Sequence, residues 1–293
     1  VYPAAVNPAA LAYAQNHLFP LVSITRVEST VSSLSDLFTR YYKTQTGIDA
    51  SSWLASAFTN ASISNNRLVA VSQIVHPQFA AWQRSVIATL SGSTSDIVIL
   101  GCHLDSVTWP LYNSRSPGAD DDASGCACVL EAFTVLLEAG YRPLKNVQFQ
   151  LYAAEEVGLL GSEDIAAAFA QEGAPVYSMM QLDMTGFPDH GGPKTIGVTT
   201  DGTSAPLNGF LEKLIVSYTS ASPVNVTCGY GCSDFDSWTQ NGYPSCFPQE
   251  SGSYKPIHTK NDLLINLSPS YMTEFVKLAL GYIIELAGIQ GVE

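Results

Sequence analysis

The sequence has little charge, and most of it is negative. Only 13% of its 293 residues are charged, and 13 Lys and Arg face 26 Asp and Glu, which gives a formal net charge of −13. An acidic surface without a cluster of Lys or Arg repels phosphate backbones, so we expect no nucleic-acid partner. No apolar run approaches the roughly 20 residues needed to cross a bilayer, so we also expect no membrane partner.

Cysteine is scarce as well, and six residues are too few for a disulfide scaffold at this length. Cys228 and Cys232 enclose a short Gly-Tyr-Gly loop, and we predict that they form a disulfide in an oxidising compartment. Cys102, Cys126 and Cys128 lie in apolar surroundings and are expected to be buried thiols.

The chain also lacks a start methionine and a signal-peptide pattern after Val1. The simplest interpretation is a processed mature chain. Neutral polar residues are abundant, which is typical of secreted proteins, and sequons at Asn60, Asn225 and Asn266 are compatible with glycosylation. We therefore expect a secreted, extracellular monomer.

The first 66 residues have a helical pattern. One helix is predicted over 9–18, a second from a cap at Ser33 or Ser35 through Tyr42, and a third over 50–58. The next residues are richer in β-branched side chains, and 67–293 are predicted to form an α/β core.

Within this core, short apolar runs alternate with helical patterns. The expected strands are 67–75 and 85–90, an antiparallel pair, and then 97–102, 147–153, 177–182, 195–200 and 243–247. The expected helices are 123–139, 159–171, 205–219, 234–240 and 268–287. This alternation predicts one α/β domain over 1–293, with a mixed, mostly parallel central sheet sandwiched by helices.

Three expected strands stop at a potential metal ligand. His103 follows the first, Glu155 and Glu156 the second, and Asp183 the third, while Asp121 lies in the loop after the first. Each residue alone is explained by a solvated loop or a helix cap. Ligand sites in open α/β sheets lie at the carboxyl ends of parallel strands, so the coincidence favours a metal centre there.

Five motifs follow one another in the 97–264 region. They are His103-Leu104-Asp105-Ser106, PGADDDASG over 117–125, AEEVGLLGS over 154–162, Leu182-Asp183-Met184 and Ile257-His258-Thr259. In order and spacing they resemble the co-catalytic dizinc aminopeptidases of the M28 peptidase family, most of all the secreted fungal leucine aminopeptidases. The first hundred residues carry no comparable signature.

The resemblance implies a zinc exopeptidase-like fold and two Zn²⁺ ions per chain. Asp121 would bridge the ions, Glu156 and His258 would complete one site, and His103 and Asp183 the other. Zinc accepts imidazole nitrogen and carboxylate oxygen and, in a catalytic site, leaves one position for water. The same ligands would accept Co²⁺ or Mn²⁺, so the sequence does not fix the metal.

The resemblance makes Glu155 the general base, which takes a proton from the water between the metals and passes it to the leaving amine. Asp105 could accept the second ring N–H of His103, or it could simply cap a loop. Tyr230 could donate its hydroxyl to the developing oxyanion, or it could be an ordinary packed tyrosine.

The first substrate side chain is poorly marked in the sequence. Met184 and Phe247, together with Tyr230, are candidate pocket walls that would favour apolar N-terminal residues such as Leu, although Met184 and Phe247 could equally belong to the core. Phe235 stands where bacterial relatives tend to have histidine, which leaves details of substrate contacts open.

Other polar residues receive structural interpretations. His17, His76 and His190 match no motif, and His190 is expected in an exposed loop. Asp120 and Asp122 flank the bridging position without ligating metal, and Asp122 is the expected N-cap of the 123–139 helix.

Three functions remain in competition. The first is a metallo-aminopeptidase acting on peptides with a free N-terminus, the second a glutaminyl cyclase-like enzyme with one zinc, and the third a metal-free binding domain. A full set of five ligands argues against the second, and the presence of Glu155 beside them argues against the third. The sequence therefore predicts a secreted dizinc aminopeptidase.

Overall fold

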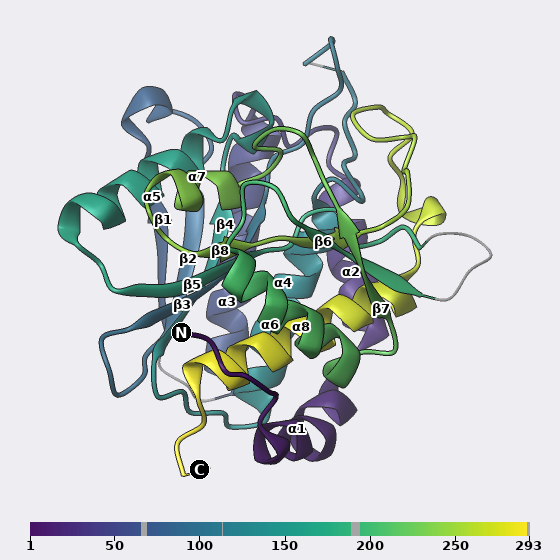
Figure 1. The fold of residues 1–293 in the computed structure, drawn as a ribbon. Helices are drawn as coiled ribbons and strands as arrows, with labels where there is room; N and C mark the ends of the chain where they lie inside the picture. The colour runs from purple at the N-terminus through teal and green to yellow at the C-terminus, as the bar shows by residue number, and fades with distance from the viewer. Residues whose placement is uncertain (66–68, 113, 189–193, 292–293) are drawn as a thin grey trace.

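A six-stranded mixed β-sheet runs through the centre of the molecule (Figure 1). The computed structural model describes residues 1–65, 69–112, 114–188 and 194–291. In sheet order the strands are β1 (Ala70–Ile74), β2 (Ser85–Leu90), β4 (Asn146–Tyr152), β3 (Ile97–His103), β5 (Val176–Gln181) and β8 (Ser245–Cys246). β3 pairs in parallel with β4 and β5, and β5 pairs in parallel with β8, whereas β1 and β2 form the expected antiparallel pair. The predicted mostly parallel sheet is confirmed.

Helices cover both faces of this sheet because the side chains of its strands alternate between two apolar cores. Val98, Leu100 and Cys102 of β3 belong to the core shared with α4 (Ala123–Glu138) and α8 (Pro269–Ala287). On the opposite face, Ile99 joins Ile165 and Trp238 in a smaller core under α5 (Leu160–Glu172) and α7 (Phe235–Gln240). Buried apolar residues on both faces explain why the strands have little polar alternation in the sequence.

A second, three-stranded sheet was not expected. Its order is β7 (Ser222–Val226), β6 (Thr195–Thr199) and β9 (Pro248–Glu250), and α6 (Ala205–Tyr218) connects β6 to β7. β7 contains Pro223 and Asn225, and because both residue types are depleted in strands, this segment is not predicted as a strand. The single strand predicted over 243–247 is wrong in extent, because β8 ends at Cys246 and β9 begins at Pro248.

The N-terminal helices differ from expectation. α1 (Pro8–Tyr13) continues as a π-helix (Ala14–Leu18), which matches the predicted first helix. α2 spans Ile24–Ser35 with Ser23 as its N-cap, and α3 spans Gln45–Ser64. The helix predicted from Ser33 or Ser35 through Tyr42 is therefore wrong.

Buried Arg40 explains this correction. Its guanidinium donates hydrogen bonds to the carbonyl oxygens of Leu104, Pro117 and Gly118, and its backbone N–H donates to Ser106. The segment after α2 thus forms hydrogen bonds with a distant loop and does not form a helix of its own. This contact also holds the loop that leads from β3 to Asp121.

Local signals at the other helix ends are confirmed. Asp122 caps α4 by accepting the Gly125 N–H at 2.8 Å, and Ser268 caps α8. Among the described residues, no helix combines the length and apolar content that crossing a bilayer requires. His190 and the first residues of the strand predicted over 67–75 lie outside the described residues.

Candidate metal centre and active site

Two triads of potential ligands meet at the carboxyl ends of β3 and β5. His103, Asp121 and Asp183 form one, and Asp121, Glu156 and His258 form the other, with the ligand atoms of each triad within 4.8 Å of one another. Asp121 is common to both. The structure therefore brings together all five residues predicted as ligands, from five separate stretches of the chain.

His103 is the most deeply buried of these side chains. Its Nε2 lies 2.9 Å from Asp121 Oδ1 and 3.5 Å from Asp183 Oδ1. Burial alone would lower the pKa of His103, but the charges of Asp183 and Glu155 and the bonds to Asp105 and Asp121 raise it well above its usual value. The carboxylates around His103 therefore favour positive charge at this position.

His258 makes the matching contacts in the second triad. Its Nε2 lies 2.9 Å from Asp121 Oδ2 and 2.9 Å from Glu156 Oε2. Burial opposes protonation, but these two carboxylates raise the pKa of His258 to about 11. Burial would raise the pKa of Asp121, yet the hydrogen bonds and charges of His103 and His258 hold it well below its usual value. Asp121 thus places one carboxylate oxygen against each histidine.

The donor set fits divalent cations. Asp121, Glu155, Glu156 and Asp183 line one cavity of about 380 Å³, and no Lys or Arg is among the described residues that line it. Within the described chain, Glu156 Oε1 and Asp183 Oδ1 are buried without a hydrogen-bond donor. Buried anionic oxygens need a partner, and carboxylate and imidazole ligands suit zinc.

Glu155 and Glu156 lie in a 3₁₀ turn after β4 (Glu155–Val157) rather than at the strand end itself. Asp105 fixes this turn, because its two carboxylate oxygens accept the backbone N–H groups of Glu155 at 2.9 Å and Glu156 at 3.3 Å. Its Oδ1 also lies 3.5 Å from His103 Nδ1, on the side predicted for it. Burial is the main reason why the pKa of Glu155 lies well above its usual value. The charges of Asp234 and Asp183 raise this pKa further, and the charge of His103 lowers it.

Backbone strain concentrates at this cavity. The residues other than glycine that have positive φ in the described chain are Ala154, Leu159, Met184 and His258. Leu159, Met184 and His258 line the cavity, and Ala154 immediately precedes Glu155. Such conformations cost of order 1–3 kcal/mol each and persist where the surrounding fold enforces them, as it does at functional sites.

Comparison with known proteins agrees with this geometry. A family model described as Peptidase family M28 matches residues 85–283, more than half of the chain. The chain belongs to peptidase family M28. It is a metallo-aminopeptidase, and therefore a hydrolase.

Relatives of this M28 enzyme include fungal and bacterial proteins. It is 38% identical over 271 residues to a probable aminopeptidase of Saccharomyces cerevisiae, an alignment that covers 89% of this chain and 72% of the relative. It is 37% identical over 275 residues to leucine aminopeptidase 1 of Colletotrichum graminicola, with 89% and 68% covered. The solved structure of LapA aminopeptidase from Legionella pneumophila is 30% identical, with a TM-score of 0.87 and 98% and 77% covered.

The residues predicted to contact substrate lie in different places in the M28 fold. Met184 and Tyr230 line the cavity that contains the two triads, and Tyr230 is 73% exposed. Phe247 is not one of the cavity-lining residues in the described chain. It is buried against Phe235, with a ring separation of 5.3 Å, so its contact with substrate stays a prediction.

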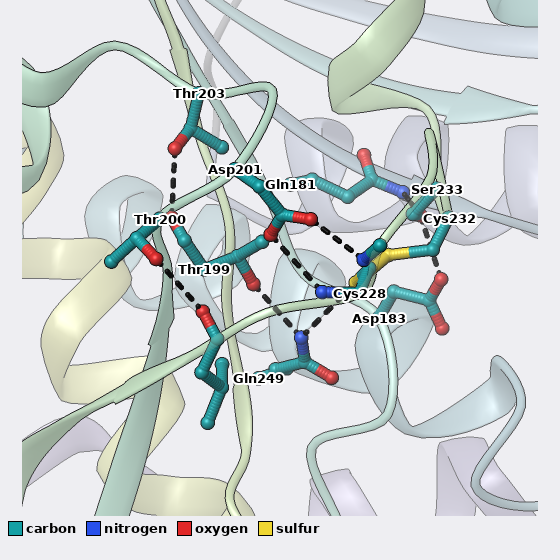
Figure 2. The surroundings of a disulfide bond; sticks show 12 residues. Gln181, Asp183, Thr199, Thr200, Asp201, Thr203, Cys228, Cys232, Ser233 and Gln249 are labelled. Carbon is teal, nitrogen blue, oxygen red and sulfur yellow. Dashed lines mark hydrogen bonds between the residues drawn. A yellow bond between two sulfur atoms is a disulfide. The ribbon is translucent and has the colours of Figure 1, made fainter.

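The loop that carries Tyr230 is closed by a disulfide between Cys228 and Cys232, as predicted (Figure 2). The Asp201 carboxylate holds the start of this loop by accepting the backbone N–H groups of Cys228 at 3.0 Å and Gly229 at 2.6 Å. The four other cysteines are free and buried. The disulfide loop is thus anchored to the second sheet on one side and forms part of the cavity wall on the other.

Sequence reasoning missed three residues that shape the centre. Ser233, just after the disulfide, donates its hydroxyl to Asp183 Oδ2 at 2.7 Å (Figure 2). Asp262 accepts the backbone N–H groups of Asp120 at 2.9 Å and Asp121 at 3.1 Å. Trp109 lines the cavity. Serine, aspartate and tryptophan in loops carry no local signal for these roles.

The histidines outside the motifs lie elsewhere. His17 is exposed on the π-helix, and buried His76 contacts Asp164 and Ser85 at 2.7 Å each. Neither belongs to the two triads. Their structural interpretation agrees with these positions.

Proposed function

We propose that this M28 enzyme is a secreted, monomeric aminopeptidase with two zinc ions, which hydrolyses the first peptide bond of peptides with a free N-terminus and prefers apolar first residues such as Leu. We also propose that residues 1–293 act as one peptidase domain, with 1–66 packed on the 67–293 core. The observation that carries the two-metal proposal is the position of Asp121 between His103 and His258, at 2.9 Å from each. One carboxylate with a separate imidazole on each oxygen is suited to bridging two cations.

The five ligands would hold zinc, which when bound supplies Lewis-acid polarisation of the substrate carbonyl and a water of lowered pKa. Glu155 lines the same cavity and is only half-buried, so its carboxylate is available to a bound water. We assign Glu155 as the base that takes the proton from this water and gives it to the leaving amine. Asp105 keeps the Glu155 backbone in place.

The remaining roles follow from position in the cavity. The half-buried Met184 side chain offers an apolar wall beside Asp183, which supports a preference for apolar first residues. The phenolic O–H of Tyr230 can donate a hydrogen bond to the developing oxyanion. The four carboxylates of the cavity would attract the α-ammonium group of a free N-terminus and repel a C-terminal carboxylate.

Metal analysis combined with two substrates tests the function. We expect about two zinc ions per chain and cleavage of Leu-p-nitroanilide, with N-acetyl-Leu-p-nitroanilide left intact. One zinc per chain with cyclisation of N-terminal Gln would overturn the proposal in favour of a glutaminyl cyclase-like enzyme. Absence of both metal and turnover would favour a binding domain.

The variant Glu155→Gln tests the base assignment. It keeps the side-chain size but removes the group that accepts a proton, so kcat should fall by about 10²–10⁴-fold with zinc content unchanged. Glu163→Gln on the adjacent α5 is the matched control and should keep wild-type kcat. An unchanged kcat in Glu155→Gln would show that another group is the base.

Secretion has its own support and test. The sequon residues Asn60, Asn225 and Asn266 are all exposed, and the Cys228–Cys232 disulfide suits an oxidising compartment. Protein recovered from the medium of its native host should carry this disulfide and lose mass on treatment with an N-glycosidase. Recovery from the cytosol alone, with reduced thiols, would contradict the proposal.

A further inference from the structure

We propose that Trp109 is the platform for the side chain of the second substrate residue, so that this enzyme favours peptides with a large apolar or aromatic residue after the scissile bond. The inference deepens the proposed aminopeptidase function and rests on it. Trp109 lines the same cavity as Glu155 and His258 and is 47% exposed, so an apolar surface beside the candidate metal centre remains open to solvent.

Trp109 is held in a fixed place at the cavity. Its backbone N–H donates to the carbonyl oxygen of His258 at 3.2 Å, and its ring centroid lies 6.5 Å from that of the His258 imidazole. Tyr112 packs edge-on against the indole with a ring-centroid distance of 4.9 Å, and the ring of Tyr41 lies 5.4 Å from that of Tyr112. A row of aromatic rings therefore supports an indole that remains open to solvent.

The position of Trp109 relative to the two triads indicates which substrate residue it meets. Asp183 and His258 belong to different triads, and Asp121 is the residue that the two triads share. Met184, the candidate wall for the first residue, follows Asp183, whereas Trp109 is bonded to His258. A substrate whose first side chain lies at the Met184 end would direct its second residue toward the Trp109 end.

The chemistry of an exopeptidase leads to the same assignment. The free N-terminus must be inside the cavity, so everything after the first peptide bond leaves through the open rim. Among the described residues that line the cavity, the exposed aromatic side chains are Trp109 and Tyr230. Since Tyr230 is assigned to the oxyanion, Trp109 is the aromatic surface left for the leaving peptide. Stacking of an aromatic side chain on a pre-positioned indole is favourable beyond the burial of area.

Three dipeptides separate the second residue from the first. Leu-Phe and Leu-Gly differ in the second residue, and Leu-Gly and Ala-Gly differ in the first. We expect wild-type kcat/KM to be higher for Leu-Phe than for Leu-Gly. Trp109→Ala should lower kcat/KM for Leu-Phe about tenfold, leave Leu-Gly within about twofold, and leave the Leu-Gly to Ala-Gly ratio unchanged.

Control variants keep the test decisive. Trp53→Ala removes an indole of similar exposure, 39%, on α3, and should change no ratio. Trp109→Phe keeps an aromatic face and should retain most of the Leu-Phe preference, which also covers the case in which Trp109→Ala folds poorly. Zinc content and thermal unfolding are measured for each variant.

Three outcomes would overturn the proposal. A loss of the Leu-Gly to Ala-Gly ratio in Trp109→Ala, with the Leu-Phe to Leu-Gly ratio kept, would place the indole in the pocket for the first residue. Equal losses for all three dipeptides would make Trp109 a purely structural residue. A Leu-Phe to Leu-Gly ratio near one in the wild type would also reject the platform. Failure of the wild type to cleave any dipeptide would instead reject the proposed function.

Discussion

Asp105 Oδ1 accepts the backbone N–H of Glu155 at 2.9 Å. This bond links the loop after β3 to the turn after β4, and the second oxygen of the same carboxylate accepts the N–H of Glu156. The two glutamates that face the candidate metal centre are therefore positioned by one buried carboxylate. Asp105 also lies beside His103, so it connects His103 of one triad to the turn that carries Glu156 of the other triad.

The variant Asp105→Asn should lower both activity and metal affinity. An amide has one acceptor oxygen in place of two, so one of the buried N–H groups of Glu155 and Glu156 would face an NH₂ group. We expect kcat/KM and zinc affinity each to fall by about 10–100-fold, as is typical when the residue that orients a ligand is changed. Zinc titration and steady-state kinetics measure the two effects. Asp49→Asn, at an exposed position on α3, is the control, and equal behaviour of the two variants would rule out the positioning role.

Ser233 should affect the two triads unequally. Its hydroxyl donates to Asp183, which belongs only to the triad of His103, and it also accepts a hydrogen bond from Gln181 at 3.1 Å. Ser233→Ala removes the donor and leaves the Asp183 oxygen without it. We expect one zinc to dissociate about tenfold more readily while the other is retained.

Stepwise dialysis against a chelator with metal analysis would resolve this difference. Ser237→Ala is a close control. Ser237 is also buried, but its hydroxyl forms a hydrogen bond with Ser162 and not with a carboxylate of either triad. Loss of both zinc ions together in Ser233→Ala would contradict a selective effect.

His76 should make the fold sensitive to acid. Burial lowers the pKa of His76 from 6.5, although the hydrogen bond and the charge of Asp164 oppose the shift. The folded protein therefore holds His76 neutral where the unfolded chain would protonate it, so stability is complete above pH 6.5 and is lost as pH falls through the lower folded-state pKa. The slope from this one group is at most about 1.4 kcal/mol per pH unit.

Thermal unfolding between pH 7 and pH 5 measures this contribution. His76→Gln removes the titrating group while keeping a side chain that can hydrogen-bond Ser85, so its Tm should change less across this range than the wild-type Tm. His17→Gln, at an exposed position, should leave the wild-type slope unchanged. A His76→Gln slope equal to the wild-type slope would show that other groups dominate.

The elements that the sequence predicted well are those specified by neighbouring residues. The apolar runs that became β3, β4 and β5 are buried on both faces, and Asp122 caps α4 with a bond to a residue three positions away. Four of the five predicted ligands end one of those strands, follow one within a few residues or lie in the loop after β3. Their convergence followed from the parallel topology alone.

The elements that the sequence missed depend on partners far along the chain. Arg40 donates hydrogen bonds to carbonyl oxygens more than sixty residues away, and these bonds hold its segment in a non-helical conformation despite the local helical pattern. Asp262 reaches the backbone of Asp121 across 141 positions. The second sheet contains β7, a strand that includes Pro223, although proline is depleted in strands. Such contacts leave no trace in local composition.

Tyr230 offers the last test, because its role depends on one atom. It lies in the loop closed by Cys228 and Cys232, which Asp201 fastens to the second sheet. If its hydroxyl donates to the developing oxyanion, Tyr230→Phe should lower kcat by about 10²-fold or less while KM changes little, because the bond is stronger in the transition state than in the bound substrate. The 73% exposure of the side chain places the expected loss at the low end, since water can supply part of the missing bond. Tyr177→Phe, whose hydroxyl donates to the carbonyl of Val1, is the control for loss of a tyrosine hydroxyl. A rise in KM at constant kcat would instead make Tyr230 a wall of the substrate pocket.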